Sequence, residues 1–143
     1  MLEDGSVYEG TARGDFKETA CEIVFNTSMT GYVEILTDPS YAGQGVVMTY
    51  PMIGNYGISR EDFESERLQP SAFIVHELSS DPSNFRCTDT IENLLKEYNI
   101  PCISGVDTRA VVKKLRESGT MRGVLTSDIG DRERLMDVIK SFR

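Results

Sequence analysis

The order of strand-like and helix-like segments constrains the fold of this 143-residue chain more than any other feature of its sequence. The first third is rich in β-branched and aromatic residues bounded by Gly, Asp and Asn, which is typical of strands joined by turns. The last third alternates between strand and helix patterns. This order predicts a single α/β (mixed α+β) domain with helices on one side of a sheet.

The strands are predicted from short apolar runs between turn residues. The run 45–50 is apolar without polar alternation, which is typical of a buried strand. The first half of 30–44 can form a short helix that ends before Asp38-Pro39, because proline disfavours helical backbone in the residue before it. The Gly/Asn/Ser-rich stretch 52–66 predicts a long ordered loop. The six predicted strands are 6–10, 21–26, 45–50, 72–78, 101–106 and 121–127.

Three helices are predicted in the second half of the chain. A capping box and apolar residues at i, i+3, i+4 and i+7 indicate a helix over 90–98. Asp107 or Thr108 can cap a second helix, and Gly119 stands where a left-handed residue ends it. The stretch 131–142 is amphipathic and predicts a third helix.

Charge and hydropathy exclude several classes of partner. The chain carries 15 Lys+Arg against 23 Asp+Glu, a formal net charge of −8, which argues against a nucleic-acid or anionic-membrane surface. No apolar run approaches the ~18 residues that would span a bilayer, and the first ten residues lack signal-peptide character. We therefore expect a soluble cytoplasmic protein with neither nucleic-acid nor membrane partners.

Thiol and imidazole groups are too few for a metal centre, and any nucleophile–histidine site must use His76 or lie outside this chain. The three cysteines are odd in number and widely spaced, which favours reduced thiols. Cys21 and Cys102 lie in apolar strands and are expected to be buried and inert, whereas Cys87 has Arg86 beside it. The single histidine, His76, lies in a predicted strand and is expected to be structural or surface-facing rather than catalytic. The sequence therefore predicts no catalytic residue, no metal site and no cofactor.

Three further motifs give weak signals for function, and one of them stays open from the residues alone. The glycines between 43 and 57 match neither the dinucleotide-binding fingerprint nor the P-loop, and the acidic cluster 61–66 is typical of a solvated surface. Asp107-Thr108-Arg109 follows a short strand and is either a capped helix start with Arg109 in an ion pair or a functional loop. Physical reasoning alone favours an interaction or accessory domain over an enzyme.

One long run of the sequence resembles a known family. GYVEILTDPSYAGQGVVMTYPMIGNYG (31–57) is similar to the small, glutaminase subunit of carbamoyl phosphate synthetase, and VDTRAVVKKLRESG (106–119) with MRGVL (121–125) extends the resemblance. The resemblance covers essentially the whole chain and implies that 1–143 is the family's amino-terminal domain, a layered β/β/α swivelling domain. The family's second domain is a class I glutamine amidotransferase with a Cys–His–Glu triad. No G-x-C-x-G turn occurs here, so we expect that glutaminase domain to be absent from the chain.

The resemblance also implies a function and partners. In the family, the small subunit hydrolyses glutamine and passes ammonia to the large subunit. The large subunit combines ammonia with bicarbonate and ATP to make carbamoyl phosphate for pyrimidine and arginine synthesis. The implied partners are the large synthetase subunit, the carboxy-terminal glutaminase domain and glutamine, with ATP used by the large subunit. This chain alone is expected to be inactive.

Ser40 is the one ligand contact that the resemblance assigns to this chain. The serine of the DPSY word is similar to the family residue that contacts glutamine bound in the neighbouring domain. A hydroxyl both donates and accepts hydrogen bonds, which suits a zwitterionic amino acid. The alternative is a turn residue after Asp-Pro. The chain departs from the family pattern at Met52, Cys21 and Val33, where His, Gly and Gln are usual.

Two functions of different classes follow. The first is a docking domain for the large subunit, and the alternative is a stand-alone non-catalytic binding or regulatory module with the same fold. The loop 52–66 is the candidate docking surface, because it combines many apolar side chains with little regular structure. Alternatively, those side chains pack on the domain's own core. The side chains in question are Met52, Ile53, Tyr56, Ile58 and Phe63.

Overall fold

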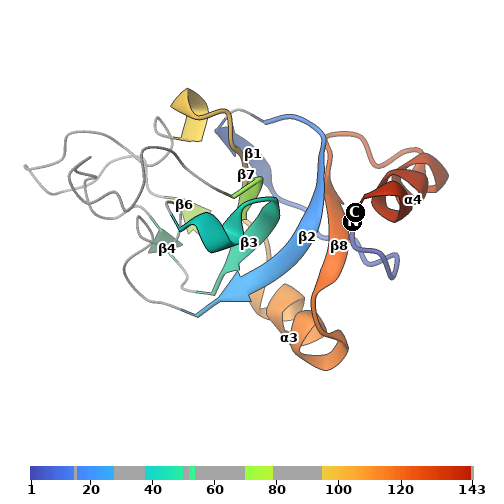
Figure 1. Cartoon of the computed structure of the whole chain (residues 1–143), viewed down its shortest axis with the longest axis horizontal. Coiled ribbons are helices and arrows are strands. Elements are labelled where there is room, and N and C mark those ends of the chain that lie inside the picture. The colour runs from blue at the N-terminus through green and yellow to red at the C-terminus, as the bar shows by residue number, and fades with distance from the viewer. Residues whose placement is uncertain (15, 28–37, 50–51, 54–69, 79–94, 143) are drawn as a thin grey trace, which may run out of the picture.

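A computed structural model describes residues 1–14, 16–27, 38–49, 52–53, 70–78 and 95–142. These residues form a six-stranded sheet of order β1-β7-β5-β3-β2-β8, a separate pair β4-β6, the helices α3 and α4, the 3-10 helix η1 and a helical turn at 95–97 (Figure 1). The sheet is mixed, which confirms the predicted mixed α/β class. The elements are β1 (Thr11–Gly14), β2 (Thr19–Asn26), η1 (Pro39–Tyr41), β3 (Gln44–Met48), β4 (Met52–Ile53), β5 (Ala72–Ile74), β6 (Glu77–Leu78), β7 (Pro101–Ser104), α3 (Thr108–Ser118), β8 (Met121–Leu125) and α4 (Arg132–Ser141).

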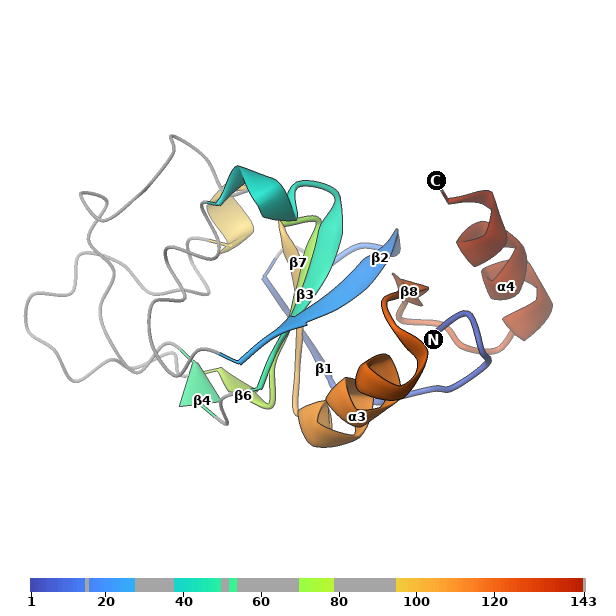
Figure 2. The ribbon, with the colours of Figure 1, turned by 60° about the horizontal axis from the view of Figure 1, so that its bottom comes forward.

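Parallel pairing in the middle of the sheet gives the domain a defined carboxyl edge. Strands β2, β3, β5 and β7 are mutually parallel, whereas β1 and β8 pair antiparallel at the two sides. The carboxyl ends of the four parallel strands therefore meet at one edge, and α3 follows β7 directly from that edge (Figure 2). In open α/β sheets this edge is the usual place for ligand sites.

The main core lies between the sheet and α3. The register places Phe25, Val47, Ile74 and Ile103 in one row across four strands. Residues on the same row of adjacent strands share a face, so this row forms a continuous apolar surface. The buried face of α3 packs on it, and each fully buried aliphatic side chain contributes about 1.5–3 kcal/mol. The residues that α3 contributes to this cluster are Val111, Val112 and Leu115.

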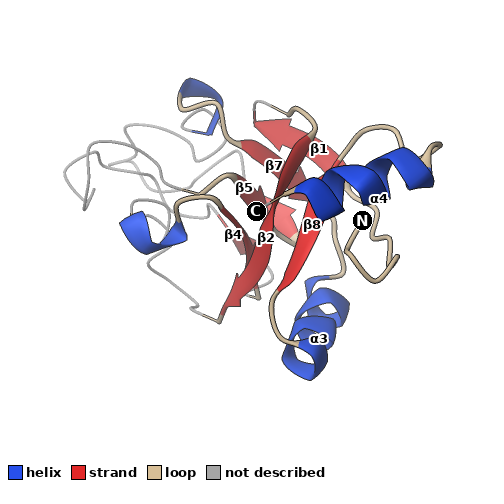
Figure 3. Cartoon of the chain, turned by 45° about the vertical axis from the view of Figure 1, so that its right-hand side comes forward, coloured by secondary structure: helices blue, strands red, loops and turns tan. Residues whose placement is uncertain are grey.

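The helices lie on both sides of the sheet, which corrects the prediction of one side (Figure 3). Successive residues of β8 point to opposite faces. Met121 and Leu125 join the cluster under α3, whereas Val124 packs with Leu135 and Ile139 of α4. Each face of β8 therefore buries apolar side chains, and a different helix packs against each face. Neither helix of the described residues is long and apolar enough to cross a membrane.

Two strand predictions are wrong and four hold with shifted ends. Residues 6–10 form no strand, because within the described residues the ladder with β7 begins only at Thr11. The predicted strand 72–78 is two strands in different sheets, because the chain leaves the ladder at Val75 and His76 before β6 pairs with β4. The predictions that hold with shifted ends correspond to β2, β3, β7 and β8. Strand β3 runs from Gln44 to Met48, so Thr49 is not part of the strand, and Tyr50 lies outside the described residues.

Local capping signals predicted the helix ends well. The Asp107 carboxylate accepts a hydrogen bond from the Ala110 amide at 3.2 Å, and Gly119 ends α3 with a φ of 78°. Residues 95–97 are helical, and Asn99 ends this turn with a φ of 59°. The start of that helix, at 90–94, lies outside the described residues, as does the short helix predicted in the first half of 30–44.

Candidate functional site

Ser40 lies in the middle of a short, locally closed turn. Asp38 caps the 3-10 helix η1, and its Oδ1 accepts a hydrogen bond from the Ser40 amide at 2.9 Å. The amides of Tyr41 and Ala42 each donate to backbone carbonyls three residues earlier, at 3.1 Å. Proline in the first turn supplies a preset φ. The Asp-Pro-Ser-Tyr word therefore determines the backbone here through local hydrogen bonds.

The turn presents the Ser40 hydroxyl to solvent. Ser40 is exposed, and its hydroxyl makes no hydrogen bond with any described residue. The Tyr41 hydroxyl accepts a hydrogen bond from Asn26 Nδ2 at 2.9 Å, which ties the turn to β2. Asn26 and Phe25 point to opposite faces of β2, so η1 lies on the face away from α3. Ser40 therefore lies on an exposed turn rather than in the core.

The two described thiols are buried, as predicted. Cys21 and Cys102 are both 0% exposed. Burial raises the pKa of the Cys21 thiol to about 12, so almost none of it is thiolate at neutral pH. Cys87 lies outside the described residues. Within the described residues, no group of three or more His, Cys, Asp or Glu could hold a metal ion.

His76 has a structural contact and no hydrogen bond to a nucleophile within the described part of the chain. It lies between β5 and β6, is exposed, and its Nδ1 is 3.2 Å from the Val106 carbonyl oxygen. The His76 carbonyl accepts a hydrogen bond from the Gly105 amide at 2.7 Å. These contacts join the loops that follow β5 and β7. No described thiol or hydroxyl is hydrogen-bonded to this imidazole, which supports the structural interpretation.

The three residues of the Asp107-Thr108-Arg109 motif have different roles in the structure. Asp107 caps α3, and Thr108 is buried at 3% exposure. Arg109 is exposed and forms no ion pair with any described residue, so the ion pair considered for it is not found among them. The guanidinium of Arg109 instead borders a groove, which no single sequence motif predicted.

That groove lies between α3 and the carboxyl ends of β2 and β3. It has a volume of about 460 Å³. Three of its lining residues are cations on α3 at positions i, i+4 and i+7. This spacing places them on one side of the helix, and it is the sequence signal that could have predicted the groove. The lining residues are Thr27, Thr49, Arg109, Val112, Lys113, Arg116 and Glu117.

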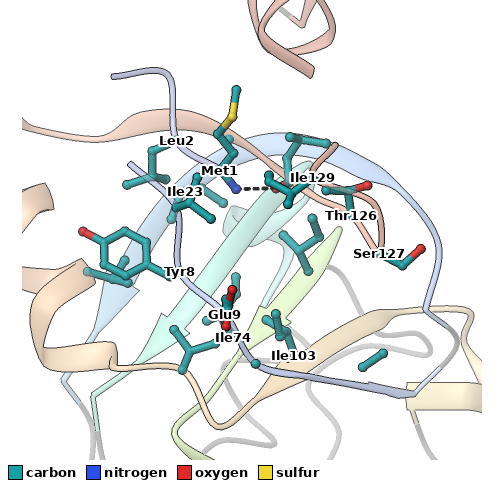
Figure 4. A pocket seen from close by; sticks show the side chains of 18 of the residues that line it. Met1, Leu2, Tyr8, Glu9, Ile23, Ile74, Ile103, Thr126, Ser127 and Ile129 are labelled. Atoms are coloured by element: carbon teal, nitrogen blue, oxygen red, sulfur yellow. Dashed lines mark hydrogen bonds between the residues drawn. The ribbon is translucent and has the colours of Figure 1, made fainter. Parts of the chain in front are cut away.

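A separate apolar cavity of about 420 Å³ lies between the N-terminal segment and the sheet face that α3 covers (Figure 4). Ile23, Ile74 and Ile103 line it from the sheet. Among the described residues, its lining includes one carboxylate, Glu9, and neither a histidine nor a cysteine. Sequence reasoning did not predict this cavity, because its walls come from segments far apart in the chain.

The candidate docking loop is described only at its first residues. Met52 and Ile53 form β4, which pairs with β6, so the predicted loop begins as a strand. The other three candidate residues, Tyr56, Ile58 and Phe63, lie outside the described residues, as does Val33. The docking role of this segment therefore stays a prediction.

Together the fold and these features define a mixed α/β domain with an exposed polar turn on one face and a cationic groove at its carboxyl edge. The family described as "Carbamoyl-phosphate synthase small chain, CPSase domain" matches residues 1–125. The chain belongs to this family, which confirms the resemblance found in the sequence.

Individual relatives carry the same description. The carbamoyl phosphate synthase small chain of Caldanaerobacter subterraneus subsp. tengcongensis is 55% identical over 125 residues, 87% of this chain and 35% of the relative. Those of Archaeoglobus fulgidus and Listeria monocytogenes serotype 4b are 52% and 47% identical, over 94% and 100% of this chain. The chain spans only 35–39% of the length of these three relatives.

Proposed function

We propose that this chain is the amino-terminal domain of the small subunit of a glutamine-dependent carbamoyl phosphate synthetase. In this role it docks on the large synthetase subunit and supports glutamine hydrolysis and ammonia delivery. The complete enzyme would make carbamoyl phosphate from glutamine, bicarbonate and ATP. Family membership supports the assignment, since relatives named carbamoyl phosphate synthase small chain match the chain over 87–100% of its length.

The observation that carries the proposed role in glutamine hydrolysis is the geometry at Ser40. Its hydroxyl is exposed and has no partner among the described residues, while Asp38 holds its backbone amide at 2.9 Å. A hydroxyl on a rigid turn loses little entropy when it binds a ligand held by a neighbouring domain. Ser40 would accept from the ammonium group or donate to the carboxylate of glutamine. The glutaminase triad would come from that other domain, so residues 1–143 alone would not hydrolyse glutamine.

The test uses the full-length small subunit assembled with its large subunit. Ser40→Ala removes one hydrogen bond to bound glutamine, worth about 0.5–1.5 kcal/mol, so the glutamine KM should rise about 2- to 13-fold with kcat retained. Ser118→Ala is the matched control, because Ser118 is also exposed and lies at the end of α3. An unchanged KM in Ser40→Ala contradicts the role of Ser40. Glutamine-dependent ammonia release by residues 1–143 alone contradicts the proposed division of labour.

A further inference from the structure

Helix α3 has one face for the core and another for the groove at the carboxyl edge. Its buried residues pack against the sheet, and Leu115 is 2% exposed. The cations Arg109, Lys113 and Arg116 lie along the exposed side and line the groove with Thr27 and Thr49. The helix is therefore held firmly by one face while it presents three positive charges on the other.

The positive charge of this groove is local and uncompensated among the described residues. The lining holds three cations and one carboxylate, Glu117, although the whole chain carries a net charge of −8. Elsewhere on the described surface, Lys114, Arg122 and Arg134 pair with acidic residues at 3.0, 3.4 and 2.8 Å. No such pair forms at the three groove cations with any described residue. A concave surface lined by one sign of charge concentrates the field and attracts the opposite charge.

Two contacts hold the floor of the groove in place. The Arg116 guanidinium lies over the ring of Phe25, with its Cζ 5.4 Å from the ring centroid. This cation–π contact orients the arginine without neutralising it. The Thr49 amide donates to the Asn26 carbonyl at 3.1 Å, which ties the ends of β3 and β2 together below the helix. The groove is thus preorganised before any partner binds.

The spacing of the cations indicates what kind of anion fits. Arg109 and Arg116 are seven residues apart on α3, which corresponds to about 10 Å along the helix axis at 1.5 Å per residue. A single phosphate or carboxylate is too small to reach both ends. Carboxylates on alternate residues of an extended segment are about 6.6–6.8 Å apart and can engage successive cations.

We propose that the groove along Arg109, Lys113 and Arg116 is the docking site for an acidic segment of the large synthetase subunit. This inference rests on the proposed function, which supplies the partner, and it adds the surface and its recognition chemistry. The segment would place two or more carboxylates along the cationic face of α3. Exposed pairs of this kind chiefly raise the association rate and make binding sensitive to salt.

The experiment titrates the 143-residue chain with the cognate large subunit by surface plasmon resonance at about 50 and 300 mM salt. Arg109→Glu/Lys113→Glu reverses two groove cations that form no ion pair with described residues. Arg132→Glu/Lys140→Glu reverses two exposed cations of α4 and changes the net charge by the same amount. Arg109→Gln/Lys113→Gln removes the attraction without adding repulsion. Circular dichroism confirms that each variant is folded.

We expect the groove reversal to raise Kd about tenfold at low salt, mostly through a slower association rate, and to flatten the salt dependence. The neutral groove variant should raise Kd about threefold, and the α4 control less than twofold. If the wild type binds and the groove and α4 reversals weaken it equally, the groove is not the docking site although the proposed function survives. If the wild-type chain does not bind the large subunit at all, the proposed docking function fails, and this inference fails with it.

Discussion

The contact between Cys21 and Gly45 makes a sharp prediction about core packing. Both residues are buried on the face of the sheet that α3 covers, and Cys21 is 0% exposed. A Cβ on residue 45 would lie 2.7 Å from Cys21 Sγ and 2.9 Å from Ile23 Cδ1. Heavy atoms in good contact are about 3.5–4.0 Å apart, so the thiol occupies the space that a side chain at 45 would need.

Gly45→Ala should therefore destabilise the domain by about 2 kcal/mol, within the usual cost of overpacking a core. Cys21→Ala alone removes one buried heavy atom and should cost about 1 kcal/mol. In the double variant the new methyl group enters the space that Sγ leaves, and the end of Ile23 can rotate away. We expect the double variant to lose about 1 kcal/mol, a coupling of about 2 kcal/mol between the two sites.

Urea denaturation followed by circular dichroism measures these free energies of unfolding. Gly43→Ala is the matched control, because Gly43 has a φ of 81° and a Cβ at this position would meet nothing within 4 Å. Its cost comes from backbone strain, so Cys21→Ala should not relieve it. The reasoning is refuted if Gly45→Ala and Cys21→Ala are additive, or if Cys21→Ala rescues Gly43→Ala equally well.

Two further predictions concern titratable groups. In a Cys87→Ala variant, Cys21 should resist a thiol reagent at pH 8 until the chain unfolds. A pKa of about 12 leaves only about one part in ten thousand of this thiol as thiolate. Rapid labelling of Cys21 in the native chain would contradict this prediction. Hydrogen bonds from Arg134 and Thr126 hold the pKa of Glu18 at about 2, below its ordinary value of 4.5. Glu18 therefore stabilises the fold above about pH 4.5 and loses this effect as the pH falls towards 2. In acid titrations, the difference in free energy of unfolding between wild type and Glu18→Gln should shrink over that window. A difference that grows there contradicts the prediction.

Local sequence signals determined the helices and turns of this protein. Asp107 and Gly119 bound α3 as predicted, because a cap and a left-handed glycine act on residues only a few positions away. Asp38-Pro39 was likewise the basis of the alternative interpretation of Ser40 as a turn residue, and the hydrogen bond from the Ser40 amide to Asp38 shows such a turn. The family was also evident from the order of short sequence motifs along the chain, and the match of its family model to residues 1–125 agrees.

Strand boundaries depended on partners that the local sequence does not contain. Residues 6–10 have strand-like composition but form no strand, because pairing with β7 requires a segment about ninety residues later and begins only at Thr11. The apolar run 72–78 looks continuous, yet its two halves pair with different strands. β propensity reports a fit to a half-buried surface, so it cannot place the point at which the neighbouring strand changes.

Sequence patterns were enough to predict the class of the domain, the ends of α3, the burial of Cys21 and Cys102, and a possible turn after Asp38-Pro39. The folded chain was needed to show that α3 and α4 cover opposite faces, and that Arg109, Lys113 and Arg116 meet Thr27 and Thr49 in one groove. The physical reason is the separation along the chain of the residues that interact. Caps, turns and burial patterns arise from neighbours along the chain, whereas a groove exists only after parallel pairing has brought the ends of distant strands beneath one helix.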